Sequence, residues 1–128
     1  MKKEAKVVFS IDYGTKNIGI CVAETFTGQS KPLQIIKNNN SVELVFDKLF
    51  EEWMPNMILI GIPSKMNENF ENNLNKFKTY IQSKYKIELI MINEDFTSQG
   101  LEAEKKKTMK DSHSAALIFE DWFNQTYG

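Results

Sequence analysis

Four acidic residues lie where the chain leaves a predicted strand or enters a predicted helix. Asp12 follows the first apolar run, Glu94 and Asp95 follow the last predicted strand, and Asp111 comes directly before the last predicted helix. Carboxylates at strand ends lie near the crevice where open α/β sheets bind ligands. Three of them together would repel one another unless a divalent cation neutralised them, and oxygen ligands favour Mg²⁺ or Mn²⁺. Such a site could hydrolyse a phosphodiester.

Each of these acids also has an ordinary structural explanation. Asp12 is close to a glycine at a strand end, where aspartates often form turns. Asp111 is suited to be a helix N-cap, and Glu94 and Asp95 could belong to a solvated loop. Spacing alone does not show that Asp12, Glu94 and Asp111 converge, so both interpretations stay open at this point.

Hydrophobic patterning predicts the elements that must position these side chains. Residues 6–11 and 17–23 are apolar, β-prone runs around a glycine-containing turn, which indicates a hairpin, and residues 32–36 are expected to add a third strand. Residues 57–62 and 87–92 are expected to be buried strands because they are nearly continuous apolar runs.

Three helices are predicted between and after these strands. The first runs from a Ser41 cap to Trp53, with apolar residues at helical spacing, and a second carries apolar residues at helical spacing between residues 70 and 85. A third spans residues 112 to about 126. The order β-β-β-α-β-α-β-α predicts an α/β fold with a mixed five-stranded sheet and helices packed against it.

Length, charge and cysteine content narrow the possible classes of protein. The 128 residues are expected to form one domain, residues 1–128. The net charge is −1 and all 16 basic residues are lysines, so the composition gives no general sign of nucleic-acid binding. A single cysteine excludes an internal disulfide. No apolar run is long enough to cross a membrane and no signal-peptide core is found, which predicts a soluble, cytoplasmic protein.

Five segments, in chain order, resemble motifs of the YqgF/RuvX family, which has an RNase H-like fold. They are Ile11–Ile20, Lys31–Leu33, Ile58–Pro63, Asn93–Ser98 and Asp111–Ala116. The family is regarded as the nuclease that matures the 5′ end of pre-16S ribosomal RNA in ribosome biogenesis, and it is related to Holliday-junction resolvases. The resemblance covers nearly the whole chain with sensible spacing.

The resemblance implies a role for particular residues of this chain. It implies that Asp12, Glu94 and Asp111 are the catalytic acids and hold Mg²⁺ or Mn²⁺. It also implies substrate contacts at four positions, which are Gly14, Thr15, Lys16 and Thr97. For Gly14 and Thr15, a tight hairpin turn is the competing explanation.

Two segments depart from the family's pattern. Asp95 stands where the family has an arginine, which reverses a charge beside the predicted site and could alter activity. Asn67-Glu68-Asn69 replaces a loop that usually carries Asp-Gly-Thr. Both departures concern substrate binding and leave the three acids in place.

The leading hypothesis is a metal-dependent endonuclease acting on precursor ribosomal RNA. One alternative is a DNA nuclease that resolves Holliday junctions. Another is a non-catalytic module that binds the ribosome or the transcription machinery. A third is phosphoryl transfer from ATP, because Asp12, Gly14 and Thr15 also resemble the phosphate loop of actin-like ATPases. Expected partners are precursor ribosomal RNA or another structured nucleic acid, with the ribosome as a further candidate and no membrane. The chain is expected to be a monomer or a weak homodimer.

Overall fold

The computed structural model describes residues 6–93 and 112–127. Its strands are β1 (Val7–Tyr13), β2 (Asn17–Glu24), β3 (Ser30–Lys37), β4 (Met57–Ile62) and β5 (Glu88–Asn93). They form a five-stranded sheet in the order β3-β2-β1-β4-β5. The pairs β1–β2 and β2–β3 are antiparallel, whereas β1–β4 and β4–β5 are parallel. The predicted mixed sheet is therefore confirmed.

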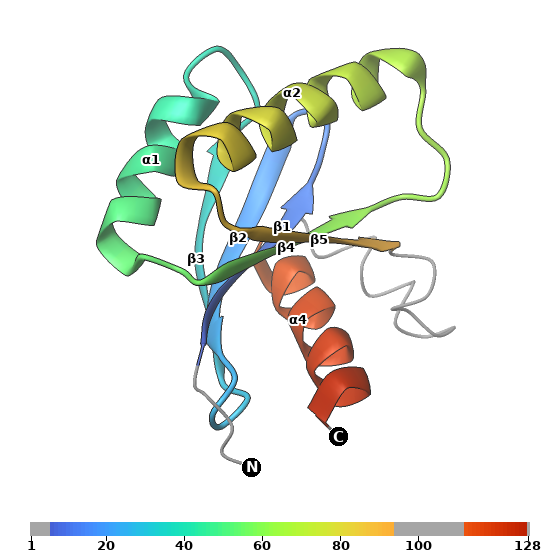
Figure 1. Cartoon of the computed structure of the whole chain (residues 1–128). Helices are drawn as coiled ribbons and strands as arrows, with labels where there is room; N and C mark the ends of the chain where they lie inside the picture. Colours follow the sequence, from blue (N-terminus) through green and yellow to red (C-terminus); the bar gives the residue numbers. More distant parts are fainter. Residues whose placement is uncertain (1–5, 94–111, 128) are drawn as a thin grey trace.

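The described helices cover both faces of this sheet. Helices α1 (Val42–Trp53) and α2 (Glu68–Tyr85) lie on one face, and α4 (Ser112–Tyr127) lies on the other (Figure 1). Each lies where the apolar periodicity predicts a helix. None of the helices in the described part of the chain is long and apolar enough to cross a membrane.

The two helix starts on the same face are built differently. The predicted Ser41 cap is wrong, because the side chain of Ser41 makes no capping hydrogen bond. Instead the Oδ1 atom of Asn39 accepts a hydrogen bond of 2.8 Å from the backbone N–H of Ser41. At the start of α2, Oδ1 of Asn67 accepts from the backbone N–H of Phe70 at 2.7 Å, which is an ordinary N-cap. Asparagines therefore organise the chain ahead of both helices.

Two strands differ from their predicted form. β1 continues two residues beyond Ile11, because Asp12 and Tyr13 pair with Gly19 and Ile18 of β2. Asp12 therefore lies inside the paired strand, not in the turn after it. β5 was predicted to be fully buried, and this is wrong, because it is the edge strand of the sheet and its residues 89–93 are half-buried.

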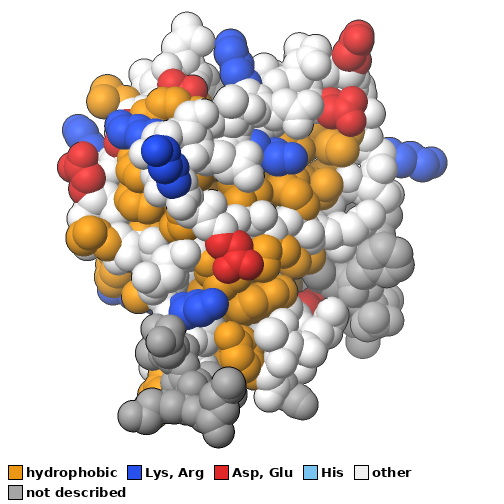
Figure 2. All heavy atoms as spheres, viewed as in Figure 1, with side chains coloured by type: hydrophobic (Ala, Val, Ile, Leu, Met, Phe, Trp, Pro, Cys, Tyr) orange, Lys and Arg blue, Asp and Glu red, His pale blue; other side chains and the backbone are white. Residues whose placement is uncertain are grey.

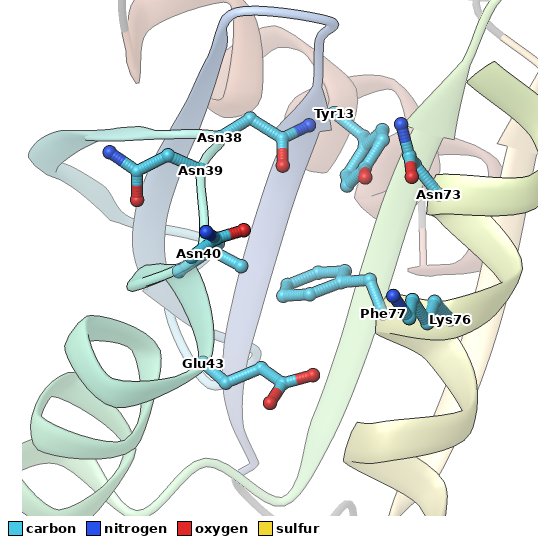
Figure 3. A pocket seen from close by; sticks show the side chains of 9 residues that line it. Tyr13, Asn38, Asn39, Asn40, Glu43, Asn73, Lys76 and Phe77 are labelled. Carbon is cyan, nitrogen blue, oxygen red and sulfur yellow. The ribbon is translucent and has the colours of Figure 1, made fainter. Parts of the chain in front are cut away.

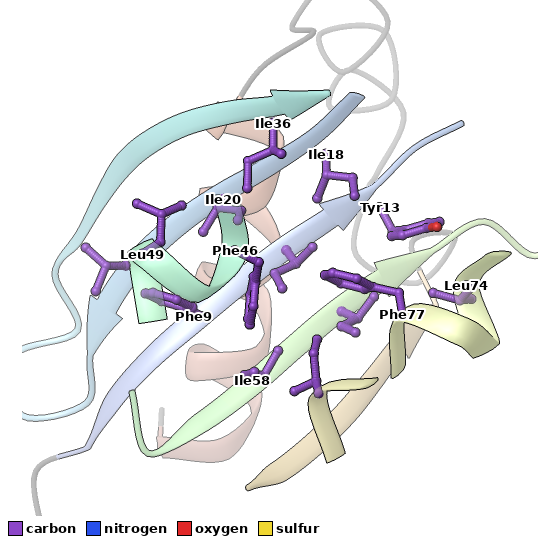
Figure 4. Close-up of a cluster of buried hydrophobic side chains, with 14 residues drawn as sticks. Phe9, Tyr13, Ile18, Ile20, Ile36, Phe46, Leu49, Ile58, Leu74 and Phe77 are labelled. Carbon is purple, nitrogen blue, oxygen red and sulfur yellow. The ribbon is translucent and has the colours of Figure 1, made fainter. Parts of the chain in front are cut away.

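Alternation along the strands divides the apolar core between the two faces. Phe9 and Ile11 of β1 pack with Phe46 of α1 and Phe77 of α2, in the larger cluster (Figure 4). The other face carries a smaller cluster, which includes Val8, Ala23, Met57, Leu59, Ile118 and Phe119. Side chains alternate along a strand. Phe9, Ile11 and Tyr13 of β1 therefore face α1 and α2, whereas Val8 and Ser10 face α4.

Candidate active site

The carboxylate of Asp12 belongs to the α4 face of the sheet. Val8 packs in the cluster under α4, and the Oγ atom of Ser10 donates a hydrogen bond of 2.6 Å to the backbone carbonyl of Ala115 in α4. Asp12 follows Ser10 by two residues and is half-buried. The twofold alternation of a strand therefore directs Asp12 to the same face, one step closer to the end of β1.

Glycines lie on both sides of Asp12 in the sheet. Asp12 is in register with Gly19 of β2 and with Gly61 of β4. Neither neighbour has a side chain, so nothing projects from these two positions onto the α4 face. A glycine inside a strand often marks a place where a ligand approaches the backbone closely. The sheet is therefore open around this carboxylate.

A hollow of about 230 Å³ lies at this opening. Its lining includes Asp12 and Gly19 from the sheet, together with Thr15 and Lys16 from the turn between β1 and β2. Thr15 and Lys16 are both exposed. The hollow thus brings one acidic and one basic residue to the same small surface.

The turn that carries Thr15 and Lys16 is held from two directions. A Cβ atom added at Gly14 would lie 2.5 Å from the carbonyl oxygen of Asn17, so only glycine fits there without a shift of the backbone. The Nδ2 atom of Asn38 donates to the carbonyl of Gly14 at 2.8 Å, and the backbone N–H of Asn38 donates to the carbonyl of Lys16 at 2.8 Å. These contacts support the turn explanation for Gly14.

Helix α4 begins at the same end of β1 as Asp12. Ala115, near the start of α4, accepts a hydrogen bond from Ser10 in β1. Phe123, two turns later, lies against the turn between β2 and β3, because a Cβ atom added at Gly28 of that turn would be 2.6 Å from the Phe123 ring. From Ala115 back to Ser112, the helix rises about 4.5 Å along its axis. From Ser10 to Asp12, β1 rises about 6.6 Å toward the same end of the sheet. The start of α4 therefore lies near the level of Asp12.

Four of the predicted site residues fall within the described residues, and the structure brings them together. Asp12, Gly14, Thr15 and Lys16 all line the one hollow. The other three, Glu94, Asp111 and Thr97, lie outside the described residues, as does Asp95. Within residues 6–93 and 112–127, no three His, Cys, Asp or Glu side chains gather as metal ligands.

Three residues with a place in this site are absent from the sequence prediction. Ser10 ties β1 to α4, and Gly19 and Gly61 leave space beside Asp12. Each carried a signal, because a serine interrupts the apolar run of β1 and glycines interrupt two apolar strands. The sequence shows these interruptions, but only the pairing between strands shows that both glycines lie beside Asp12.

Charges of both signs are mixed on one face of the molecule. On the face shown in Figure 2, lysine and acidic side chains of the described residues are interspersed over apolar ones. Tyr13, which follows Asp12 but belongs to the opposite face, has a raised pKa because burial disfavours its charged form, and a hydrogen bond with Asn38 offsets part of this rise. Tyr13 is therefore neutral near pH 7. In the lining of the hollow beside Asp12, the basic residue is Lys16.

Solved structures of two resolvases share this architecture. RuvC from T. thermophilus, solved in complex with a Holliday junction substrate, superposes with a TM-score of 0.62 at 12% identity, over 95% of this chain and 96% of that one. The Fowlpox virus resolvase, solved with Holliday junction DNA, gives a TM-score of 0.54 at 12% identity, over 95% of this chain and 99% of that one. The fold is thus the RNase H-like α/β fold of resolvases.

The sequence comparisons identify the family. The sequence model of RuvX, described as Holliday junction resolvase, matches residues 6–125. A protein of Blochmanniella floridana named "Putative pre-16S rRNA nuclease" is 30% identical, over 98% of this chain and 99% of that protein. A protein of the same name from Hydrogenovibrio crunogenus is 31% identical, over 92% of this chain and 93% of that protein. The chain belongs to the RuvX family of nucleases.

Proposed function

We propose that the chain is a metal-dependent endonuclease that processes the 5′ end of pre-16S ribosomal RNA in the cytoplasm, as a single domain spanning residues 1–128. Relatives named as pre-16S ribosomal RNA nucleases match it over nearly their whole length. The observation that carries the catalytic part is the position of Asp12, in an open hollow beside two glycines and near the start of α4.

The topology supports a shared site for the three predicted acids. Asp12 is in register with Gly61, and Gly61 with Ile92, so Asp12 and Ile92 are two strand spacings apart, about 10 Å between Cα atoms. Glu94 follows Ile92 by two residues, and Asp111 directly precedes Ser112, the first residue of α4. Asn93 and Ser112, the described residues on either side of the segment, therefore lie toward the same end of the sheet as Asp12, which supports the proposal that Glu94 and Asp111 join it.

Asp12 fits the predicted metal in chemical type and setting. It offers hard oxygen atoms at a half-buried position that opens into the hollow. We propose that Asp12, Glu94 and Asp111 hold Mg²⁺ or Mn²⁺, both of which prefer carboxylate oxygens. A bound divalent ion would activate water and stabilise the leaving oxygen of the phosphodiester.

The remaining residues of the hollow have roles in binding and orientation. The exposed ammonium group of Lys16 is placed to attract a phosphate, and the hydroxyl of Thr15 can donate to a phosphate oxygen. Gly14 gives the turn its shape, and Asn38 fixes that shape through the Gly14 carbonyl. We extend the same substrate-binding proposal to Thr97, on the family resemblance alone.

Resolution of a DNA junction is the second candidate function. It is favoured by the description of the family and by the shared fold with two resolvases whose structures contain Holliday junction DNA. Both reactions hydrolyse a phosphodiester, so the same carboxylates serve either one. The substrates differ in their sugars and in their shape, and a direct comparison separates them.

The test is a cleavage assay with the purified protein. A precursor 16S fragment and a four-way DNA junction are each incubated with Mg²⁺, with Mn²⁺ or with chelator. We expect the RNA to be cut at its 5′ side with either metal and not with chelator. Asp12→Asn, which keeps the size of the side chain and removes its charge, is expected to lower the rate at least ~100-fold, equivalent to about 2.7 kcal/mol of transition-state stabilisation.

An exposed glutamate of α2 provides the control for this substitution. Glu71→Gln also replaces a carboxylate by an amide, but it lies outside the hollow, and it is expected to retain activity. Cleavage of the junction alone would assign the second function. Unchanged, metal-dependent cleavage by Asp12→Asn would contradict the proposed site, and the absence of cleavage of either substrate would favour a non-catalytic binding module.

A further inference from the structure

A second polar cavity lies on the other face of the sheet, at the same edge as the hollow beside Asp12. It has a volume of about 360 Å³ and lies between the Asn38–Asn40 segment, the start of α1 and the middle of α2 (Figure 3). That volume is within the range of sites for small ligands. The function proposed above makes no use of this cavity.

The lining of the cavity is rich in side-chain amides. Asn38, Asn39 and Asn40 come from the loop after β3, and Asn73 comes from α2. Within the described part of the chain, the side chains of Asn40 and Asn73 make no hydrogen bond to other residues. An amide offers a donor and an acceptor side by side, which is the pattern that the edge of a nucleobase presents.

Charge and shape favour a base over a phosphate in this cavity. Its lining includes one carboxylate, Glu43, and one ammonium group, Lys76, so their charges offset each other. Figure 3 shows the ring of Phe77 and the carboxylate of Glu43 directed into the space between the asparagine loop and α2. A neutral, polar group therefore suits the cavity better than an anion.

The cavity is connected to the predicted active site through the β1–β2 turn. A smaller hollow of about 40 Å³ shares Tyr13, Asn38 and Asn73 with the cavity, and it also includes Thr15. Thr15 in turn lines the hollow beside Asp12. A strand of nucleic acid crossing this turn would pass Lys16 and the neighbouring Lys37, which ends β3.

We propose that this cavity binds one nucleobase of a single-stranded RNA segment next to the scissile phosphate. The proposal rests on the nuclease function above and adds a substrate-reading subsite to it. Sequence-specific recognition of RNA uses unpaired bases whose edges bond to side chains. Because the carboxylate of Glu43 only accepts hydrogen bonds, the favoured base carries an exocyclic amino group, which adenine, cytosine and guanine have and uracil lacks.

The test measures binding separately from cleavage. Fluorescent pentamers of oligoadenylate, oligouridylate and oligodeoxyadenylate are titrated with the full chain in chelator, so that no metal-dependent cleavage takes place. We expect oligoadenylate to bind at least fivefold more tightly than oligouridylate. Asn73→Leu is expected to weaken oligoadenylate binding about tenfold. The control is Asn75→Leu, a substitution at an exposed position of the same helix outside the cavity, and it is expected to change nothing.

Each result has a defined meaning. Equal effects of Asn73→Leu and Asn75→Leu, or no preference for oligoadenylate, would overturn the subsite. Equal affinity for oligoadenylate and oligodeoxyadenylate would keep the base site and remove its restriction to RNA. Metal-dependent cleavage without any effect of Asn73→Leu on binding would support the nuclease function and overturn the base-binding subsite. Base-selective binding without cleavage of any substrate would support the subsite and overturn the nuclease function.

Discussion

Asp12 and Tyr13 are neighbours in β1, and the two regions they enter are opposite in character. Tyr13 is buried and packs against the rings of Phe70 and Phe77, with ring centroids 5.5 and 5.4 Å away. Asp12 is half-buried, lies between two glycines and lines an open hollow. One strand therefore serves a packed core on one face and a candidate active site on the other.

The difference shows how rigidity and openness are combined. The face of Tyr13 is filled by aromatic rings from α1 and α2, and this fixes the position of β1. On the other face, the space beside Asp12 results from the lack of side chains at Gly19 and Gly61. Changes to the buried rings of the first face should therefore act on stability, and changes beside Asp12 should act on chemistry.

The largest expected effect is on the packed face. Phe46 is fully buried, and its ring meets those of Phe9 and Phe77 edge to face, at 5.9 and 5.5 Å. Phe46→Ala is expected to lower the free energy of unfolding by about 3–5 kcal/mol, because it leaves a cavity in the core. Urea denaturation measures this. Leu44→Ala, at an exposed position of the same helix, should change stability by less than about 0.5 kcal/mol.

The next effect distinguishes the open face. Gly19→Ala puts a methyl group beside Asp12 and is expected to lower metal-dependent cleavage at least ~10-fold, because small displacements of reacting groups are costly. Rates under single-turnover conditions measure this. Ile35→Ala, in register with Gly19 and also lining the hollow, removes bulk instead and should have little effect. Equal losses for both variants would show that the space beside Asp12 is not the critical feature.

Ser10 lies on the same face as Asp12 and ties β1 to α4, so its removal should affect both stability and activity modestly. Ser10→Ala removes the hydrogen bond to the Ala115 carbonyl and is expected to cost about 1–2 kcal/mol of stability, with a smaller loss of activity. Thermal unfolding and cleavage rates measure the two effects. Ser10→Cys, which keeps a weak donor, should lie between the two proteins. A Ser10→Ala protein as stable as the original would mean that this bond does not hold α4 in place.

The smallest effect concerns the contact between α1 and α2. Asp47 accepts hydrogen bonds from Tyr80 at 2.5 Å, from Lys84 at 2.8 Å and from the hydroxyl of Tyr85. Burial raises the pKa of Asp47, but these three hydrogen bonds and the charge of Lys84 outweigh it, so the pKa lies below its usual value. The stabilisation is therefore complete above the unfolded pKa of about 3.9 and is lost as the pH falls through the folded pKa.

Asp47→Asn tests this contact through its pH dependence. At pH 7 the substitution is expected to cost about 1 kcal/mol, and the difference from the original protein should shrink below about pH 4. Denaturant unfolding across pH 2–7 measures both quantities. Leu44→Ala, at an exposed position of the same helix, changes no ionisable group and should show no such trend. A difference that stays constant with pH would show that the charge of Asp47 is not involved.

The sequence predicts the elements well because their patterns are local. Periodicity along α1 and α2 and the apolar run of β4 depend on residues close together in the chain, and they are confirmed. The position of β5 at the edge could not be predicted in this way, since edge and interior strands are both apolar here. Ser41 does occupy the N-cap position, but the sequence does not show that its side chain makes no capping bond while Asn39 accepts from its backbone N–H.

The candidate site is only partly predictable for a related reason. The family resemblance singles out Asp12, and the structure places it on the face of α4. Gly19 and Gly61 become meaningful only through pairing across strands that are far apart in sequence. The same holds for the asparagine cavity, whose residues come from the loop after β3 and from α2. Convergence of Asp12 with Glu94 and Asp111 stays a prediction.

Anomalous diffraction from crystals grown with Mn²⁺ tests most directly whether Asp12 holds a divalent metal at the α4 face. We expect an anomalous peak in the hollow lined by Asp12, with a carboxylate oxygen of Asp12 within about 2.0–2.6 Å, the range for hard cations and oxygen ligands. Glu94 and Asp111 should contact the same ion or its neighbour. An Mn²⁺ ion bound by Glu94 and Asp111 with Asp12 out of contact would show that Asp12 is not a metal ligand.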